Sequence, residues 1–318
     1  MKIKIIATIS ALITILSATV AYSAQTFMTI CAGKTTGADY AIANVIADAI
    51  TAKEDNFHCL VDAGSSSIAN TNLVGTAGVE VAFLQNDVAY WAYNADLMFQ
   101  GKPLKGLRAV AALYPEDIHF LVKKDSGIAS VRDLVGKRVG FGNQAAGIEG
   151  DVQSIFETVG LSLEELESAN LMSPQVVASR FGNNQIDAAF AAASYPDATA
   201  AELITSGDVT LVGFDDETLA KLNETYPYFV TSIIPAGTYE GVSEDVKVPA
   251  VMTILATSEE ISDKWVYEFL TVLFDNLGAI HDLNANGAKI SLEGALDGIT
   301  IPLHPGAEKF YKEKGLIE

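Results

Sequence analysis

From residue 25 onward, short apolar runs of strand-forming residues alternate with segments whose apolar residues recur at helical spacing. Three times near the beginning, an apolar run ends in a glycine or polar turn and a helical segment follows. The runs are residues 27–32, 57–62 and 79–84, and the helical segments include residues 40–51 and 88–94. This alternation is typical of βαβ units, in which parallel strands are covered by helices. The sequence therefore predicts an α/β fold.

The same alternation continues along the rest of the chain. Further strands are predicted at residues 107–114, 118–123, 138–141, 186–192, 209–214 and 248–256. Further helices are predicted at residues 128–134, 149–159, 174–181 and 258–277. We expect Pro115, Glu116 and Asp117 to separate the first two of these strands, and Ser258 to begin the last helix.

The length of the chain indicates two lobes, because roughly 295 residues after an N-terminal leader exceed what one hydrophobic core comfortably serves. The order of elements suggests a first lobe, a second lobe and a return, with the strand at 248–256 bringing the chain back. We therefore expect lobe 1 to hold residues 24–118 and 250–318, lobe 2 to hold residues 119–249, and a ligand cleft to lie between them.

The N-terminus has the arrangement of a secretory signal peptide. Lys2 and Lys4 precede an unbroken apolar run over residues 5–20, and small side chains follow at residues 21–24. The apolar run is short for a permanent membrane span, although a retained anchor is the alternative interpretation. We expect cleavage after Ala21 or Ser23, which assigns residues 1–23 to the signal peptide and the rest of the chain to the periplasm.

The net charge limits the kinds of partner that the protein can bind, and the two cysteines raise the question of a disulfide bond. The formal net charge of −20 becomes −22 when Lys2 and Lys4 leave with the signal peptide, which argues against nucleic acid or an anionic lipid surface as partner. Cys31 and Cys59 would face an oxidising compartment on two short strands, and a disulfide can form if the strands are neighbours in suitable register; two buried thiols are the alternative. The histidines lack ligand-like spacing, so no metal site is expected.

Five turns that follow predicted strands carry the polar residues expected of a binding site. Ligands of open α/β sheets gather beyond the carboxyl ends of strands, where helix N-termini offer free N–H groups. The glycines and the hydroxyl and amide side chains here suit hydrogen bonding to a small polar molecule. Turn formation and helix capping are the alternative explanation. The turns are residues 33–40, 64–67, 85–87, 142–148 and 192–197.

No catalytic or cofactor motif is evident. The chain has no Gly-x-Ser-x-Gly elbow, and the serines at 65–67 are better explained as helix caps than as nucleophiles. Gly140, Gly142 and Gly147 resemble a dinucleotide fingerprint, but four residues rather than two separate the last pair. We therefore predict neither an enzyme nor a bound cofactor.

The turns and their flanking residues together resemble the TAXI family, the solute-binding proteins of TRAP transporters. The resemblance covers nearly the whole chain after the leader and is carried by residues 33–40, 62–67, 81–90, 107–116, 125–128, 134–139, 185–188 and 302–307. It implies a type II periplasmic-binding fold whose lobes, joined by crossing strands, close on a ligand. It also implies that the protein delivers this ligand to the membrane subunits of a transporter driven by an ion gradient.

The resemblance also implies a set of ligand-binding residues and a ligand class. In lobe 1 these residues are Thr36, Tyr40, Ser65, Ser66, Gln85 and Asp87, and in lobe 2 they are Asn143, Gln144, Gly147 and Ser194. Family members bind glutamate or related small carboxylates, but residues 145–148 lack the hydroxyl donors that the family commonly has there. An extracytoplasmic enzyme or a sensor module on the same fold are the alternative functions.

Two further residues are expected at the cleft. Asp39 stands where the family often has an aromatic residue, and an inward-pointing acid would favour an amino group on the ligand. Tyr114 ends a predicted strand, and we expect closure of the lobes to bury its ring together with those of Tyr40 and Tyr195.

Overall fold

A computed structural model describes residues 26–53, 57–64, 66–142 and 147–318, so the predicted signal peptide lies outside the described residues. The helices are α1 (Ala38–Thr51), α2 (Ser67–Gly75), α3 (Asn86–Asn94), α4 (Ile148–Val159), α5 (Pro174–Gly182), α6 (Ala198–Thr205), α7 (Asp216–Thr225), α8 (Asp263–Asp275), α9 (Leu277–His281) and α10 (Pro305–Lys314). The strands are β1 (Thr26–Cys31), β2 (Phe57–Asp62), β3 (Val81–Gln85), β4 (Leu107–Lys123), β5 (Arg138–Phe141), β6 (Ser168–Leu171), β7 (Ala188–Ala193), β8 (Val209–Val212), β9 (Val230–Ile234) and β10 (Val246–Ser258).

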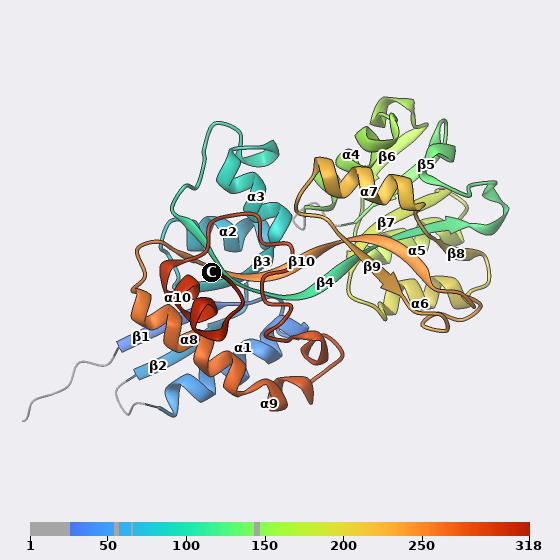
Figure 1. Cartoon of the computed structure of the whole chain (residues 1–318). Helices are drawn as coiled ribbons and strands as arrows, with labels where there is room; N and C mark the ends of the chain where they lie inside the picture. The colour runs from blue at the N-terminus through green and yellow to red at the C-terminus, as the bar shows by residue number, and fades with distance from the viewer. Residues whose placement is uncertain (1–25, 54–56, 65, 143–146) are drawn as a thin grey trace, which may run out of the picture.

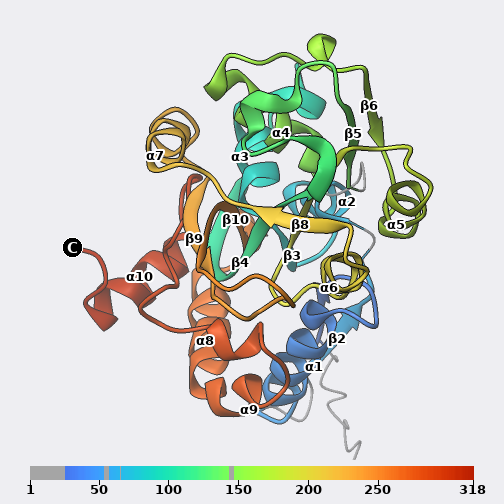
Figure 2. The ribbon, with the colours of Figure 1, turned by 90° about the vertical axis from the view of Figure 1, so that its right-hand side faces the viewer.

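Two long strands, β4 and β10, join two groups of helices and strands (Figure 1). We call the group built on β1–β3 with α1–α3 and α8–α10 lobe 1, and the group built on β5–β9 with α4–α7 lobe 2. Figure 2 shows α1, α8 and α9 together at one end of the molecule, where α1 contacts both of the other helices. The described helices include none that is both long and apolar enough to cross a membrane.

One mixed sheet runs through both lobes in the order β2-β1-β3-β10-β4-β7-β5-β6, with β8 on β4 and β9 on β10. The pairs β1–β2, β1–β3, β5–β6 and β5–β7 are parallel, as the alternation of strands and helices predicts. β10 pairs with β3 of lobe 1 near one end and with β9 of lobe 2 near the other. β4 lies between β10 and β7 in the sheet and pairs with both. The α/β prediction is confirmed, and β4 and β10 are the connection between the lobes.

The expected break at Pro115 is wrong, because β4 continues for 17 residues through it. Its antiparallel partner β10 places Thr253 opposite Tyr114 and Met252 opposite Pro115, and a register shift beside Thr253 accommodates the irregularity. A proline that cannot donate a backbone hydrogen bond is tolerated next to such a bulge. The expected lobe boundaries at 118/119 and 249/250 both fall inside these strands, and the division into residue ranges stays a prediction.

The last long helix begins later than its sequence suggests. Ser258 pairs with Leu107 at the end of β10, and α8 begins at Asp263, where the Ser262 hydroxyl accepts a hydrogen bond from the Trp265 N–H at 3.3 Å. Both serines have the chemistry of an N-cap. Because Ser258 is paired in the sheet, Ser262 is the serine that caps α8.

The two cysteines are free and buried, so of the two alternatives left open by the sequence the structure has two buried thiols and not the disulfide. Parallel pairing of β1 with β2 places Cys59 opposite Met28 and Cys31 opposite Asp62. The cysteines are thus three residues out of register, which is about 10 Å along a strand and puts them on opposite faces of the sheet. Cys31 packs in the hydrophobic cluster that includes Trp91, and Cys59 packs in the cluster under α1.

The larger hydrophobic cluster extends from lobe 1 into lobe 2. It contains Trp91 of α3, Val152 of α4 and Tyr228, whose ring lies 5.6 Å from that of Trp91. Asn86 strengthens this junction, because its side-chain amide donates to the backbone oxygens of Tyr228 and Gly298 and its Oδ1 accepts from the Met252 N–H. α3 is therefore the element through which lobe 1 packs on lobe 2.

Candidate functional site

Turns from the two lobes meet at a pocket of about 420 Å³. Thr36 and the beginning of α1 line it from lobe 1, and Ser194, Tyr195 and Pro196 line it from the turn after β7. The side chain of Ser194 donates a hydrogen bond to the Pro115 oxygen at 2.8 Å, which anchors this turn on β4. Two of the five turns predicted to bind a ligand therefore face each other.

Asp39 and Tyr114 form a pair inside lobe 1. The phenol of Tyr114 on β4 donates a hydrogen bond to the carboxylate of Asp39 in the first turn of α1. Burial raises the pKa of Asp39, while the hydrogen bond from Tyr114 acts in the opposite direction. Burial also raises the pKa of Tyr114 well above its usual range, so the tyrosine stays the donor. Tyr114 is accordingly a partner of Asp39 rather than a free aromatic surface.

Glu116 is a third acid in this region, on strand β4 near Asp39 and Asp87. Its carboxylate accepts hydrogen bonds from the side chains of Gln85, at 2.9 Å, and Thr253, at 2.6 Å. Burial raises its pKa to about 7, and the negative charges of Asp39 and Asp87 add to this effect. Sequence reasoning missed this residue because the Pro-Glu-Asp segment was interpreted as a break between strands.

Asp87 and Asp151 approach each other from the two lobes. Asp87 is in the first turn of α3, Asp151 is in the first turn of α4, and both side chains have 0 % exposure. Burial raises the pKa of Asp87 to about 7. Burial and then the charge of Asp87 raise the pKa of Asp151 well above its usual range.

Sequence reasoning also missed Asp151, although a signal was present. Asp151 stands among Ile148, Val152 and Ile155, on the apolar and buried side of α4. An acid in such a position is rarely buried without a specific reason. Together with Asp39, Asp87 and Glu116 it forms a set of four acids that we call the acidic cluster.

Gly147 brings α4 against the acidic cluster. It caps α4 with a φ of +83°, and a β-carbon at this position would lie 2.8 Å from Oδ2 of Asp87. A left-handed backbone and this close approach both require glycine. Gly147 thus lies at the contact between the lobes, beside Asp87.

The remaining predicted residues are not part of the acidic cluster. Ser66 caps α2 by accepting a hydrogen bond from the Ala69 N–H at 3.2 Å, which is the structural role that the sequence left as the alternative. Tyr40 is half-buried and packs against the hydrophobic cluster under α1. Ser65, Asn143 and Gln144 lie outside the described residues.

One basic side chain lies beside the turn at 192–197. Nζ of Lys289 is 3.7 Å from the centre of the Tyr195 ring, and it attracts the buried carboxylate of Asp117. Burial lowers the pKa of Lys289. Asp117 and Glu116 are neighbours on β4, so their side chains leave the strand on opposite faces. This contact therefore belongs to the other face of β4 from the acidic cluster.

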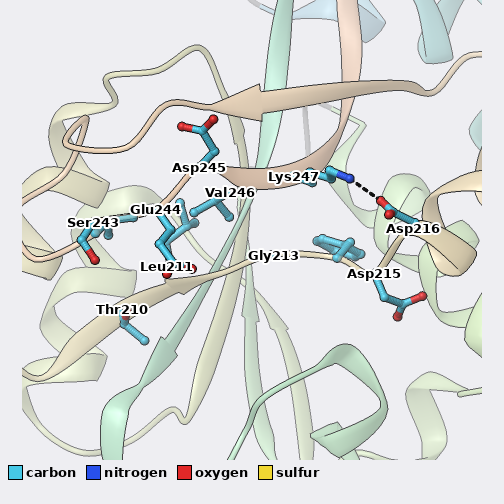
Figure 3. A pocket seen from close by; sticks show the side chains of 12 residues that line it. Thr210, Leu211, Gly213, Asp215, Asp216, Ser243, Glu244, Asp245, Val246 and Lys247 are labelled. Carbon is cyan, nitrogen blue, oxygen red and sulfur yellow. Dashed lines mark hydrogen bonds and ion pairs between the residues drawn. The ribbon is translucent and has the colours of Figure 1, made fainter.

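A larger pocket, of about 650 Å³, lies on lobe 2 (Figure 3). Two of its acids already have structural partners: Asp216 pairs with Lys247 at 2.6 Å, and Asp215 caps α7 through the Thr218 N–H at 2.7 Å. Residues 210–216 and 242–247 supply its lining, and none of the predicted ligand-binding residues is among them. Its size alone does not make it the stronger candidate site.

A protein-family model described as the NMT1-like family matches residues 30–315. The chain belongs to the NMT1-like family. Solved structures with the same fold include the alkanesulfonate-binding protein SsuA from Xanthomonas axonopodis pv. citri bound to MOPS, at 14 % identity and a TM-score of 0.52, covering 91 % of this chain and 84 % of that one.

Two further structures match this NMT1-like protein in fold. The periplasmic aliphatic sulphonate-binding protein SsuA from Escherichia coli has 12 % identity and a TM-score of 0.53, with 91 % of this chain and 84 % of that one covered. A TctC solute-binding protein from Polaromonas, solved with no ligand, has 15 % identity and a TM-score of 0.50, with 93 % and 98 % covered. These likenesses establish a fold of the periplasmic-binding-protein type for this NMT1-like protein.

Proposed function

We propose that this NMT1-like protein is a periplasmic solute-binding protein that closes its two lobes on a small polar ligand. The observation that carries the proposal is the meeting of α3 and α4 at the acidic cluster, where Asp87 of lobe 1 and Asp151 of lobe 2 are buried together. A ligand bound there contacts both lobes at once and therefore stabilises the closed arrangement. Strands β4 and β10 are the segments about which the lobes would move.

The ligand is passed on to the membrane subunits of a transporter. The resemblance to the TAXI family supports a TRAP-type secondary transporter as the recipient. The predicted signal peptide at residues 1–23 supports a periplasmic location, and we propose residues 24–118 with 250–318, and 119–249, as the two moving units. Membership of the NMT1-like family and a fold of the periplasmic-binding-protein type support a binding role rather than catalysis.

Within the ligand classes implied by the resemblance, the acidic cluster favours an amino acid over a simple carboxylate. A dicarboxylate would bring two negative charges towards Asp39, Asp87 and Glu116. An amino acid brings an ammonium group as well. Backbone N–H groups at helix N-termini can hold its carboxylate.

The proposal is tested by isothermal titration calorimetry with amino acids, dicarboxylates and sulfonates, together with small-angle X-ray scattering. Protein unfolded in denaturant and refolded serves as the ligand-free sample, and native mass spectrometry of the untreated protein detects any retained small molecule. We expect 1:1 binding and a smaller radius of gyration with the ligand that binds. A ligand that binds without any compaction contradicts the closure mechanism.

A further inference from the structure

We infer, on the basis of the proposed function, that the ligand carries a protonated amine held by Asp87, Asp151 and Oε1 of Gln85, beside Glu116. A small carboxylate or sulfonate without an amine is then not the ligand. This assigns a charge class to the ligand and a role to two acids, Glu116 and Asp151, that no sequence motif identified.

The first argument is a shortage of hydrogen-bond donors. Both carboxylate oxygens of Asp87 and of Asp151 are buried, and apart from a proton that the two acids can share they have no hydrogen-bond donor among the residues that the structure describes. Buried acceptors without donors are costly, and charged ones most of all. An ammonium group brings three donors and no acceptor.

Gln85 provides an independent indication, because it is an amide and not an acid. Its side chain is 2 % exposed, and its Nε2 donates to Glu116 at 2.9 Å. This contact directs the amide towards the acidic cluster. Its Oε1 is buried and accepts no hydrogen bond within the described residues. A neutral acceptor oriented in this way also calls for a donor from a ligand.

The second argument is charge. Within the described residues, no lysine, arginine or histidine forms an ion pair with any of the four acids. Residues 54–56, 65 and 143–146 contain no basic side chain in the sequence. The described side chains also include no group of three or more His, Cys, Asp and Glu arranged to hold a metal ion. An organic cation is therefore the counter-charge that suits this site.

The positions of Asp87 and Asp151 in different lobes explain how a bound cation would favour closure of the lobes. Asp87 belongs to α3 of lobe 1 and Asp151 to α4 of lobe 2, so their repulsion, when both are ionised, pushes the lobes apart. A cation placed between them removes this repulsion and attracts both helices. Asp39 and Glu116 are half-buried rather than enclosed, which leaves one side of the acidic cluster accessible.

The experiment uses a matched four-carbon series, to which the five-carbon amino acid glutamate is added. Refolded, ligand-free protein is titrated calorimetrically with 1,4-diaminobutane, 4-aminobutanoate, glutamate, succinate and butane-1-sulfonate. Two buffers of different ionisation enthalpy report the protons released on binding. We expect an amine to bind 1:1 and to release protons. In Asp87→Asn and Asp151→Asn we expect at least a tenfold higher Kd and fewer protons released.

Control variants distinguish a loss of binding at the acidic cluster from a general effect of removing one negative charge. Asp208→Asn changes an exposed aspartate of lobe 2, and Glu244→Gln changes an exposed glutamate in the pocket of Figure 3; both should bind as the unmodified protein does. Glu116→Gln is a third site variant if either Asn variant fails to unfold cooperatively.

Each outcome decides the inference. Binding of succinate or the sulfonate, with compaction and without binding of any amine, overturns the cation and leaves the solute-binding function standing. Amine binding that is unchanged in the three site variants overturns the assigned residues. Absence of binding by every compound overturns both the inference and the function on which it rests.

Discussion

A β-carbon on Gly147 would lie 2.8 Å from Oδ2 of Asp87, so the beginning of α4 in lobe 2 touches the beginning of α3 in lobe 1. Gly147→Ala should therefore hold the lobes apart and weaken ligand binding by at least tenfold. The left-handed φ adds roughly 1–2 kcal/mol of destabilisation. Calorimetry and X-ray scattering of the ligand-saturated variant measure the two effects.

Gly160→Ala is the matched control for that variant. Gly160 ends α4 with a φ of +77°, but a β-carbon there would have no heavy atom within 4 Å apart from its neighbours along the chain. It carries the same backbone strain without the contact to Asp87. Equal losses of affinity in the two variants would contradict a role for the Gly147–Asp87 contact in closure.

The stability of the ligand-free protein should fall as the pH rises from about 4 to about 7. Burial raises the pKa of Asp87 and of Glu116 to about 7, above the value of roughly 4 for an unfolded chain. The folded state then binds more protons in this range, so their stabilising contribution is complete below the unfolded pKa and is lost as the pH rises through the folded pKa.

Asp87→Asn removes one of these titrating groups and its repulsion of Asp151 and Glu116. We expect the free energy of unfolding at pH 8 to rise by about 1–3 kcal/mol, and its dependence on pH to become shallower. Urea denaturation at several pH values measures both quantities. Asp208→Asn, at an exposed position, is the comparison, and an unchanged slope in Asp87→Asn would refute the assignment.

Asn86 should be one of the most important side chains for stability. It is fully buried, and its amide makes three hydrogen bonds, of 2.7–2.8 Å, to the backbone of Tyr228, Gly298 and Met252. Asn86→Ala leaves those groups without partners and should lower the free energy of unfolding by about 3–5 kcal/mol.

Asn94→Ala is the control on the same helix. Asn94 is exposed, and its side chain bonds only to the Tyr90 oxygen of its own helix among the described hydrogen bonds. Its replacement should change the free energy of unfolding by less than about 1 kcal/mol. Similar losses in the two variants would mean that Asn86 does not join α3 to its neighbours in the way the structure indicates.

Both cysteines should stay reduced and unreactive in the native protein. Burial raises the pKa of Cys31 to about 11 and that of Cys59 to about 12, so little thiolate is present near neutral pH. Without reductant, iodoacetamide should add two labels in denaturant and none in the native state over the same time. Mass spectrometry counts the labels, and a denatured protein that takes none would indicate a disulfide.

The sequence predicted those features that depend on neighbours along the chain. β2 has the predicted bounds, β1 begins one residue earlier than expected, and Asp87 follows β3 as expected, whereas Gln85 is the last residue of that strand. The features that failed depend on distant partners. Pro115 continues a strand because β10 pairs with it, and Ser258 stays in β10 because Leu107 lies opposite.

The features of the candidate site also fall into those that depend on neighbours along the chain and those that depend on distant partners. Local periodicity and turn chemistry determined that polar turns follow buried strands, because apolar spacing and capping act over a few residues. Only the tertiary structure decided that Glu116 and Asp151 join Asp87, and that Cys31 and Cys59 face away from each other. Strand register and helix docking set these relationships, and both arise from packing between segments far apart in the chain.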